Sequence, residues 1–231
     1  MRRASYARAD VDETETAPST RAGRRQQATN DTRASIIEAA RQTLLDVGSA
    51  NLSTRAVAEA AEVPLSQIHY HFGSKQQLIL AVLDAENRKL LERQSAMFAG
   101  PEPLSVHWAR ACDYLDVDLE SGYVRILQEM ISAGWSDAEV AAAVRGYMGG
   151  WFRLLGDVAT REAHRLGGLG PFTAGEVAAL MGVPFMGAES MILLGVGEAD
   201  LPIRSALRKL GRVIRMIEDG HLPAVVAEGD A

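Results

Sequence analysis

The chain has 231 residues, of which 47% are hydrophobic and 23% charged, with a formal net charge of −6. This is the composition of a globular protein with one large domain or two small ones. The single cysteine, Cys112, excludes an internal disulfide and a cysteine-rich zinc site. No apolar run approaches the roughly 18 residues that a membrane helix needs, and the N-terminus has no apolar core of a secretory signal. We expect a cytoplasmic protein with no membrane partner.

The charge is divided unevenly along the chain. Residues 21–75 carry 7 Lys or Arg against 5 acidic residues, whereas residues 76–231 carry 14 against 21. This asymmetry is expected if only the front segment meets a polyanion. Residues 1–30 show no apolar periodicity, and their mixture of Arg, Ala, Thr, Ser, Asp and Glu predicts a disordered tail.

Helical patterns begin near Asp31. Apolar residues at helical spacing predict a helix from there to Gly48, where a left-handed glycine would end it. A short helix is predicted after Ser53, which is a good N-cap, and another over residues 64–72. These three helices, with a tight turn between the second and the third, fit either a helix-turn-helix or a generic helical bundle.

A long helix follows. Ser74 and Gln77 form an S-x-x-Q capping box, and the pattern continues to about Phe98. Glycines and prolines divide the rest of the chain into predicted helices over 104–119, 123–133, 137–166, 173–195 and 203–218. No alternating strand pattern is visible. We predict an all-α protein, with a three-helix unit over 31–77 and a larger helical bundle over 78–231.

The residue identities in the N-terminal unit indicate a protein family more specifically than its helix spacing does. The stretches NLSTRAVAEAAEV (51–63) and IHYHFGSKQQL (68–78) closely resemble the helix-turn-helix DNA-binding domain of the TetR family of transcriptional regulators. The resemblance covers about 31–83, although Glu62 stands where the family commonly has glycine. It implies a homodimer that binds a palindromic operator in double-stranded DNA, represses transcription, and is released by a small effector bound in the helical bundle.

In the second short helix, Ile68 and Phe72 are four residues apart and predict its buried face. Its outward residues would then include Ser66, Gln67 and His69, followed by Tyr70 and His71. The Gln67 amide matches an adenine edge, while the tyrosine and the second histidine suit phosphate or sugar contacts. The two histidines are two apart and point in different directions, so we expect no metal site.

Further DNA contacts are predicted on either side of this helix. Lys75, with the N-terminal amides of the long helix, is a candidate phosphate clamp. Ser53 and Thr54 would contribute in the same way at the first short helix, where Ser53 is also expected to cap. Arg55 would reach a phosphate or a guanine, and Leu65 a thymine methyl group.

The C-terminal region is rich in Met, Gly and Trp. This fits either an ordinary helical core or an adaptable apolar cavity for a small effector. Glycines such as Gly149 and Gly150 would leave room in such a cavity. The candidate lining residues are Met130, Trp135, Met148, Trp151, Phe152, Met181, Phe185 and Glu189.

The last two predicted helices are where similar proteins dimerise. They carry small and apolar residues that permit close packing across a two-fold axis or, equally, inside one chain. These residues are Ala178, Ala179, Gly182, Val183, Gly187 and Ala188. Phosphate-loop, zinc-protease and nucleophile-elbow motifs are all missing from the sequence, so we expect neither an enzyme nor a cofactor. The alternative is an effector-binding or interaction protein of the same fold that does not bind an operator.

Overall fold

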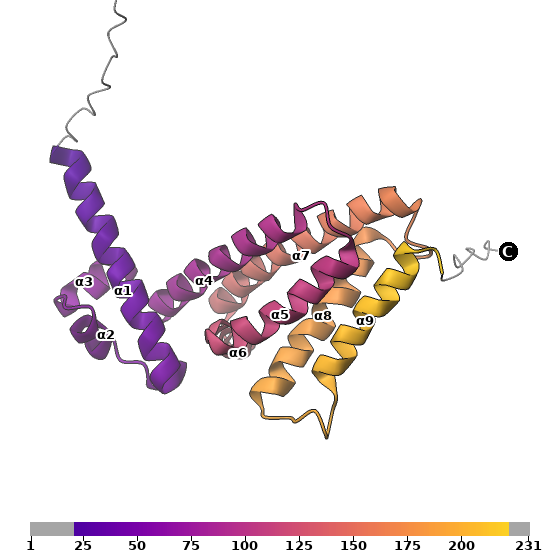
Figure 1. Cartoon of the computed structure of the whole chain (residues 1–231). Coiled ribbons are helices and arrows are strands. Elements are labelled where there is room, and N and C mark those ends of the chain that lie inside the picture. Colours follow the sequence, from indigo (N-terminus) through magenta and orange to yellow (C-terminus); the bar gives the residue numbers. More distant parts are fainter. Residues whose placement is uncertain (1–20, 222–231) are drawn as a thin grey trace, which may run out of the picture.

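The computed structural model describes residues 21–221, which are almost entirely helical (Figure 1). The helices are α1 (Arg21–Asn51), α2 (Thr54–Ala60), α3 (Leu65–Phe72), α4 (Lys75–Phe98), α5 (Leu104–Glu120), α6 (Tyr123–Gly134), α7 (Ala138–Leu166), α8 (Ala174–Leu193) and α9 (Ile203–Glu218). Within this part of the chain, β pairing is limited to one isolated bridge, between Leu169 and Pro171. The all-α prediction is confirmed, and the helices after residue 50 begin and end within about two residues of their predicted bounds.

The prediction of a disordered tail is wrong for residues 21–30. They form the first turns of α1, while residues 1–20 lie outside the described residues. Side-chain hydrogen bonds from Gln26 to Asn30 (3.2 Å) and from Gln27 to Asp31 (2.8 Å) each span about one helical turn. Because this segment is mostly exposed, it has no apolar face, and its sequence shows no apolar periodicity.

Two turns of the N-terminal unit use the left-handed region of backbone conformation. Gly48 has φ 75° and bends the chain near the end of α1, as predicted. Glu62 has φ 55°, the one positive φ among the described residues other than glycine, and it lies in the turn between α2 and α3. A side chain in that conformation costs about 1–2 kcal/mol, so this turn lowers the free energy of unfolding.

The N-terminal unit and the bundle share one hydrophobic core. Ile36 of α1 and Ile68 of α3 are buried in the same cluster as Val124 of α6 and Val140 of α7. The helix α4 runs without a break from this unit into the bundle, so the predicted boundary at 77/78 falls inside a helix. The helix α4 is therefore a continuous physical connection between the bundle and the N-terminal unit.

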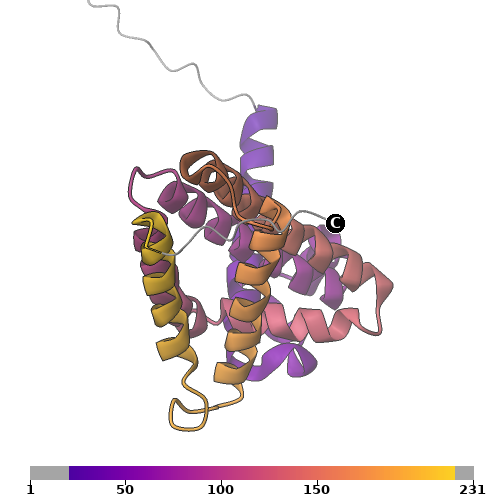
Figure 2. The same cartoon turned by 90° about the vertical axis from the view of Figure 1, so that its right-hand side faces the viewer.

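The other end of the bundle is built on α5, α7, α8 and α9. The Trp108 indole of α5 donates a hydrogen bond of 2.7 Å to the Leu207 carbonyl of α9. Figure 2 shows α8 and α9 running along this end, joined by the extended loop over residues 194–202. Among the described helices, α8 alone has the length and apolar composition to cross a membrane. One side of α8 packs into the bundle through Phe185 and Ala188, while most of the helix surface, including Leu180 and Val183, is exposed.

Candidate DNA-binding and ligand-binding sites

The short helix α3 packs against the core with one side and exposes the other side to solvent. Ile68 and Phe72 are buried, as predicted, and pack in the cluster that also contains Val57 of α2. Tyr70 is 76% exposed, and its ring touches only the edge of the neighbouring His71 ring, at 5.0 Å between centroids. With its polar neighbours Ser66 and His69 also exposed, this helix has the form of a recognition helix.

The predicted DNA-contact residues lie on three consecutive elements. Ser53, Thr54 and Arg55 are at the start of α2; Leu65, Ser66, Gln67, His69, Tyr70 and His71 are on α3; and Lys75 is at the start of α4. Leu65 is partly buried against the core, so only part of its side chain is open to a thymine methyl group.

The caps of these helices differ from the prediction in one case. Ser53 is the N-cap of α2, but its side chain makes no capping hydrogen bond, so the expected capping role is wrong and the hydroxyl is free. Ser74 does cap α4, accepting a hydrogen bond from the Gln77 amide at 3.1 Å. The Gln77 side chain does not complete the box, because it donates to Glu139 of α7 at 2.6 Å instead. This hydrogen bond ties the start of α4 to the bundle.

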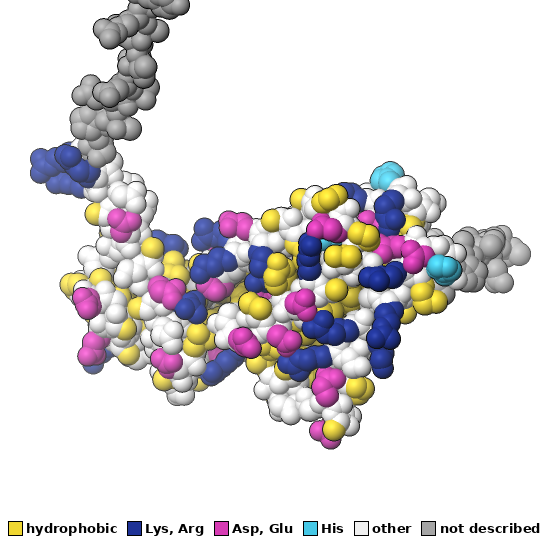
Figure 3. Space-filling view, in the orientation of Figure 1, with side chains coloured by type: hydrophobic (Ala, Val, Ile, Leu, Met, Phe, Trp, Pro, Cys, Tyr) yellow, Lys and Arg dark blue, Asp and Glu magenta, His cyan; other side chains and the backbone are white. Residues whose placement is uncertain are grey.

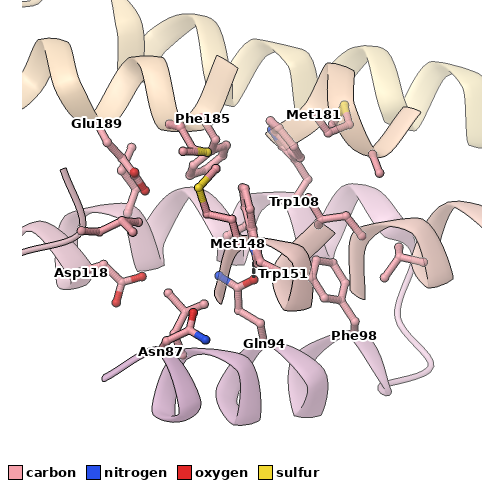
Figure 4. A pocket seen from close by; sticks show the side chains of 18 of the residues that line it. Asn87, Gln94, Phe98, Trp108, Asp118, Met148, Trp151, Met181, Phe185 and Glu189 are labelled. Atoms are coloured by element: carbon pink, nitrogen blue, oxygen red, sulfur yellow. Dashed lines mark hydrogen bonds between the residues drawn. The ribbon is translucent and has the colours of Figure 1, made fainter. Parts of the chain in front are cut away.

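A cavity of about 110 Å³ lies inside the bundle, between α4, α5, α7 and α8 (Figure 4). Of the predicted ligand residues, Met148, Trp151, Met181, Phe185 and Glu189 line it. Its wall is otherwise mostly apolar and aromatic, as in small-molecule sites.

Three predicted lining residues lie elsewhere. Met130 is buried in the core shared with the N-terminal unit, and Trp135 is 83% exposed at the end of α6. Phe152 follows Trp151 on α7 and does not line the cavity, although the rings of both residues approach Gly182 of α8. The composition of the region identified the right residue types, but the phase of each helix decides which of them face the cavity.

The two glycines expected to leave room in the cavity do not face it. A side chain at Gly150 would meet Leu91, and one at Gly149 would meet Arg153. Neither glycine lines the cavity, so enlarging them is not a test of ligand binding.

The sequence reasoning missed the polar residues of the cavity wall. Asn87 and Gln94 are seven residues apart on the buried face of α4, a spacing that marks one side of a helix and could have identified them. The Gln94 carbonyl accepts a hydrogen bond of 2.8 Å from the Trp151 indole, and the Tyr123 hydroxyl donates to Asn87 at 3.4 Å. These hydrogen bonds orient the side chains that surround the cavity.

Two carboxylates occupy one end of the cavity. Asp118 of α5 accepts two hydrogen bonds from Arg93 of α4, at 2.8 and 2.6 Å, although burial still raises the pKa of this carboxyl. Glu189 of α8 has a buried Oε2 atom that finds no hydrogen-bond partner among the described residues. Burial and the nearby charge of Asp118 raise the pKa of Glu189 to about 7, opposed by the nearby Gln128 amide, which also donates to the Met186 carbonyl at 3.4 Å.

The helix α6 touches both the cavity and the N-terminal unit. Its Tyr123 and Leu127 line the cavity. Its Glu129 accepts a hydrogen bond of 2.8 Å from the Ser49 amide at the end of α1, and pairs with Arg125 at 3.1 Å. A ligand that shifts α6 would therefore pull on α1.

A helix-turn-helix unit at one end of the described chain and an internal cavity in the bundle are the two features that characterise its fold. Residues 36–82 match the model of the bacterial regulatory proteins of the tetR family. The N-terminal part of the chain is thus similar to the DNA-binding unit of that family, and the described chain as a whole has the fold of the solved TetR regulators. A comparison with curated proteins gave no match.

Solved structures agree with this fold over most of the chain. A TetR transcription regulator from Haloarcula marismortui is 18% identical, with 80% of this chain and 96% of that one covered and a TM-score of 0.65. The transcriptional regulator FadR from Bacillus subtilis, solved in complex with stearoyl-CoA, is 12% identical. The match covers 81% of this chain and 98% of that one, with a TM-score of 0.64. A protein from Saccharomonospora viridis, solved in complex with choline, is 18% identical. The match covers 82% of this chain and 96% of that one, with a TM-score of 0.64. At these identities the likeness establishes the fold.

Proposed function

We propose that the protein is a homodimeric transcriptional repressor of the cytoplasm, which binds a partly palindromic operator and is released by a small, largely apolar effector. The observation that carries this proposal is the pairing of an open, polar recognition helix with an apolar cavity in one chain. The continuous helix α4 joins the two, since it begins beside α3 and lines the cavity with Asn87 and Gln94.

On DNA, α3 would enter the major groove, and its counterpart in the dimer would enter the next one about 34–36 Å away. Gln67 would read a base edge, and the free Ser53 hydroxyl would bind a phosphate. The Lys75 ammonium donates one hydrogen bond of 3.0 Å to the Ala50 carbonyl. An ammonium group has three donors, so two remain for the DNA backbone. The arginines at the N-terminal end of α1 (Figure 3) lie on the same domain and would add to the attraction.

The outer sides of α8 and α9 would form the dimer interface. Leu180 and Val183 of α8 are 55% and 58% exposed, and Met216 and Ile217 of α9 are each 44% exposed. Exposed apolar side chains on two adjacent helices favour an interface. The small residues predicted there divide into two groups: Ala178, Gly182 and Ala188 are buried within this chain, whereas Ala179, Val183 and Gly187 are exposed and available to a partner.

The class of effector has to come from this cavity, because the fold accommodates very different ligands. The Bacillus subtilis neighbour was solved with stearoyl-CoA and the Saccharomonospora viridis neighbour with choline. In the present chain, Phe98, Trp108 and Trp151 are among the side chains that make the wall predominantly apolar. A ligand buried there would bring mainly apolar surface.

A mobility-shift assay with the full chain and the DNA upstream of its own gene tests operator binding. Binding should weaken steeply between low and high salt through counterion release. Lys75→Ala should weaken binding to all sequences alike, whereas Gln67→Ala should cost about 1–3 kcal/mol at one base position only. Lys89→Ala removes the same charge from an exposed site further along α4 and is the matched control.

Failure to bind any duplex at low salt would refute the proposal. It would leave the alternative, a ligand-binding or interaction protein of the same fold without an operator.

A further inference from the structure

We infer that the effector is a lipophilic monocation, whose ammonium group binds Glu189 and whose aromatic or aliphatic body fills the rest of the cavity. This inference rests on the proposed function, since it assigns a chemical class to the ligand of the same cavity. It is carried by the distribution of polar and charged groups around the wall.

The cavity has a polar end and an apolar end. Figure 4 shows Glu189 directed into the space between the helices on the same side as Asp118 and Asn87. Phe98 and Trp108 lie at the opposite side, close to Met181 of α8. A ligand with one polar head and one apolar body matches this arrangement, because each part would meet its own kind of surface.

The charge at the polar end points to a cation. Asp118 already has a cationic partner, because it accepts two hydrogen bonds from Arg93. Among the described residues that line the cavity there is no Lys, Arg or His, and the other polar groups at this end are the uncharged Asn87 and Tyr123. The ionised carboxylate of Glu189 would therefore stand without a compensating charge, and one positive group on a ligand would complete the site. A ligand carboxylate would instead meet two carboxylates.

The unpartnered oxygen of Glu189 supports the same conclusion. A buried polar atom without a hydrogen bond is destabilising, and this atom belongs to a residue that faces a cavity. A cationic head group placed beside it would compensate the carboxylate electrostatically, whether or not that group carries an N–H donor. The rings of Trp151 and Phe185 in the same wall offer additional cation–π contacts.

The size of the cavity limits what can enter without a structural change. Its volume of about 110 Å³ is smaller than the roughly 150 Å³ of an engineered cavity that holds benzene. A single ring with an ammonium group would already push the walls apart. Because α4 and α6 are among these walls and also contact the N-terminal unit, filling the cavity is coupled to the recognition helix.

The test compares two probes of the same shape, phenethyltrimethylammonium and its neutral carbon isostere, (3,3-dimethylbutyl)benzene. Their affinities for the full chain are measured by tryptophan fluorescence, since Trp108 and Trp151 line the cavity. The ratio of cation affinity to neutral affinity should fall at least tenfold in Glu189→Gln. It should stay unchanged in Glu92→Gln, which makes the same charge change at an exposed site.

A pH series gives a second readout, because the quaternary ammonium does not titrate. The groups that face Glu189 are Asp118 with Arg93, the Tyr123 hydroxyl, whose pKa is raised by burial, and the Gln128 amide. With a pKa of about 7 for Glu189, wild-type affinity for the cation should rise about tenfold from pH 6 to pH 8. The Glu189→Gln variant retains the other groups and should show no such rise.

An unchanged affinity ratio in Glu189→Gln would overturn the inference and leave the proposed function intact, because the cavity would still bind ligands. Absence of cation binding to the wild type would overturn it as well. The mobility-shift assay tests operator binding independently of either probe, so failure of the proposed function is recognised separately.

Discussion

Replacing Glu189 with glutamine should change how the stability of the fold depends on pH. The pKa of this carboxyl is raised from 4.5 to about 7 by burial, so the folded chain retains a proton that the unfolded chain releases. The stability gained by protonation is fully present below about pH 4.5 and is lost as the pH rises toward 7. Integrating these two pKa values from pH 5 to pH 8 gives a loss of about 2.5 kcal/mol for the wild type. The glutamine variant has no proton to lose.

The free energy of unfolding of Glu189→Gln, measured relative to the wild type by urea denaturation, should therefore rise by about 2.5 kcal/mol between pH 5 and pH 8. Protein concentration must be equal in all samples, because dimer formation contributes to stability. Glu92→Gln, at an exposed site on α4, should follow the wild type at both pH values. Parallel curves for Glu189→Gln and wild type would refute the reasoning, since they would mean that Glu189 ionises near its ordinary pKa.

Three further predictions concern coupling, reactivity and assembly. Glu129→Gln weakens the contact between α6 and the Ser49 amide. The factor by which a bound effector lowers operator affinity should then be at least fivefold smaller, while the affinity for the effector is unaltered. An unchanged factor would exclude coupling through this contact. Burial raises the pKa of the Cys112 thiol to about 11, so a disulfide reagent at pH 8 should modify the folded chain far more slowly than the urea-unfolded chain, and equal rates would contradict the burial. Val183→Asp places charges in the proposed interface and should shift sedimentation toward monomer, whereas Thr160→Asp on the exposed side of α7 should not; an unaffected dimer would move the interface elsewhere.

Local chemistry determined much of what was predictable from the sequence. Helix ends are set by residues next to them, such as the capping Ser74 and the left-handed Gly48, so their positions follow from short stretches of chain. The buried pair Ile68 and Phe72 follows from helical spacing alone, and it fixes which side of α3 is open. The exposed first turns of α1 escaped prediction because a helix without an apolar face leaves no periodic signal.

Tertiary structure alone decided the ligand site. Spacing shows that a side chain turns inward, but it does not show which distant helix it meets, and the cavity is assembled from α4 to α8 across about 100 residues of chain. Met130 is buried, but it lies in the core shared with the N-terminal unit and not in the cavity wall. Trp135 lies at the end of α6 and is exposed to solvent. Glu189 reads in the sequence as one more acidic residue. Its raised pKa and unpartnered oxygen exist because the fold removes it from water without a cation beside it, and desolvation depends on the whole three-dimensional surroundings.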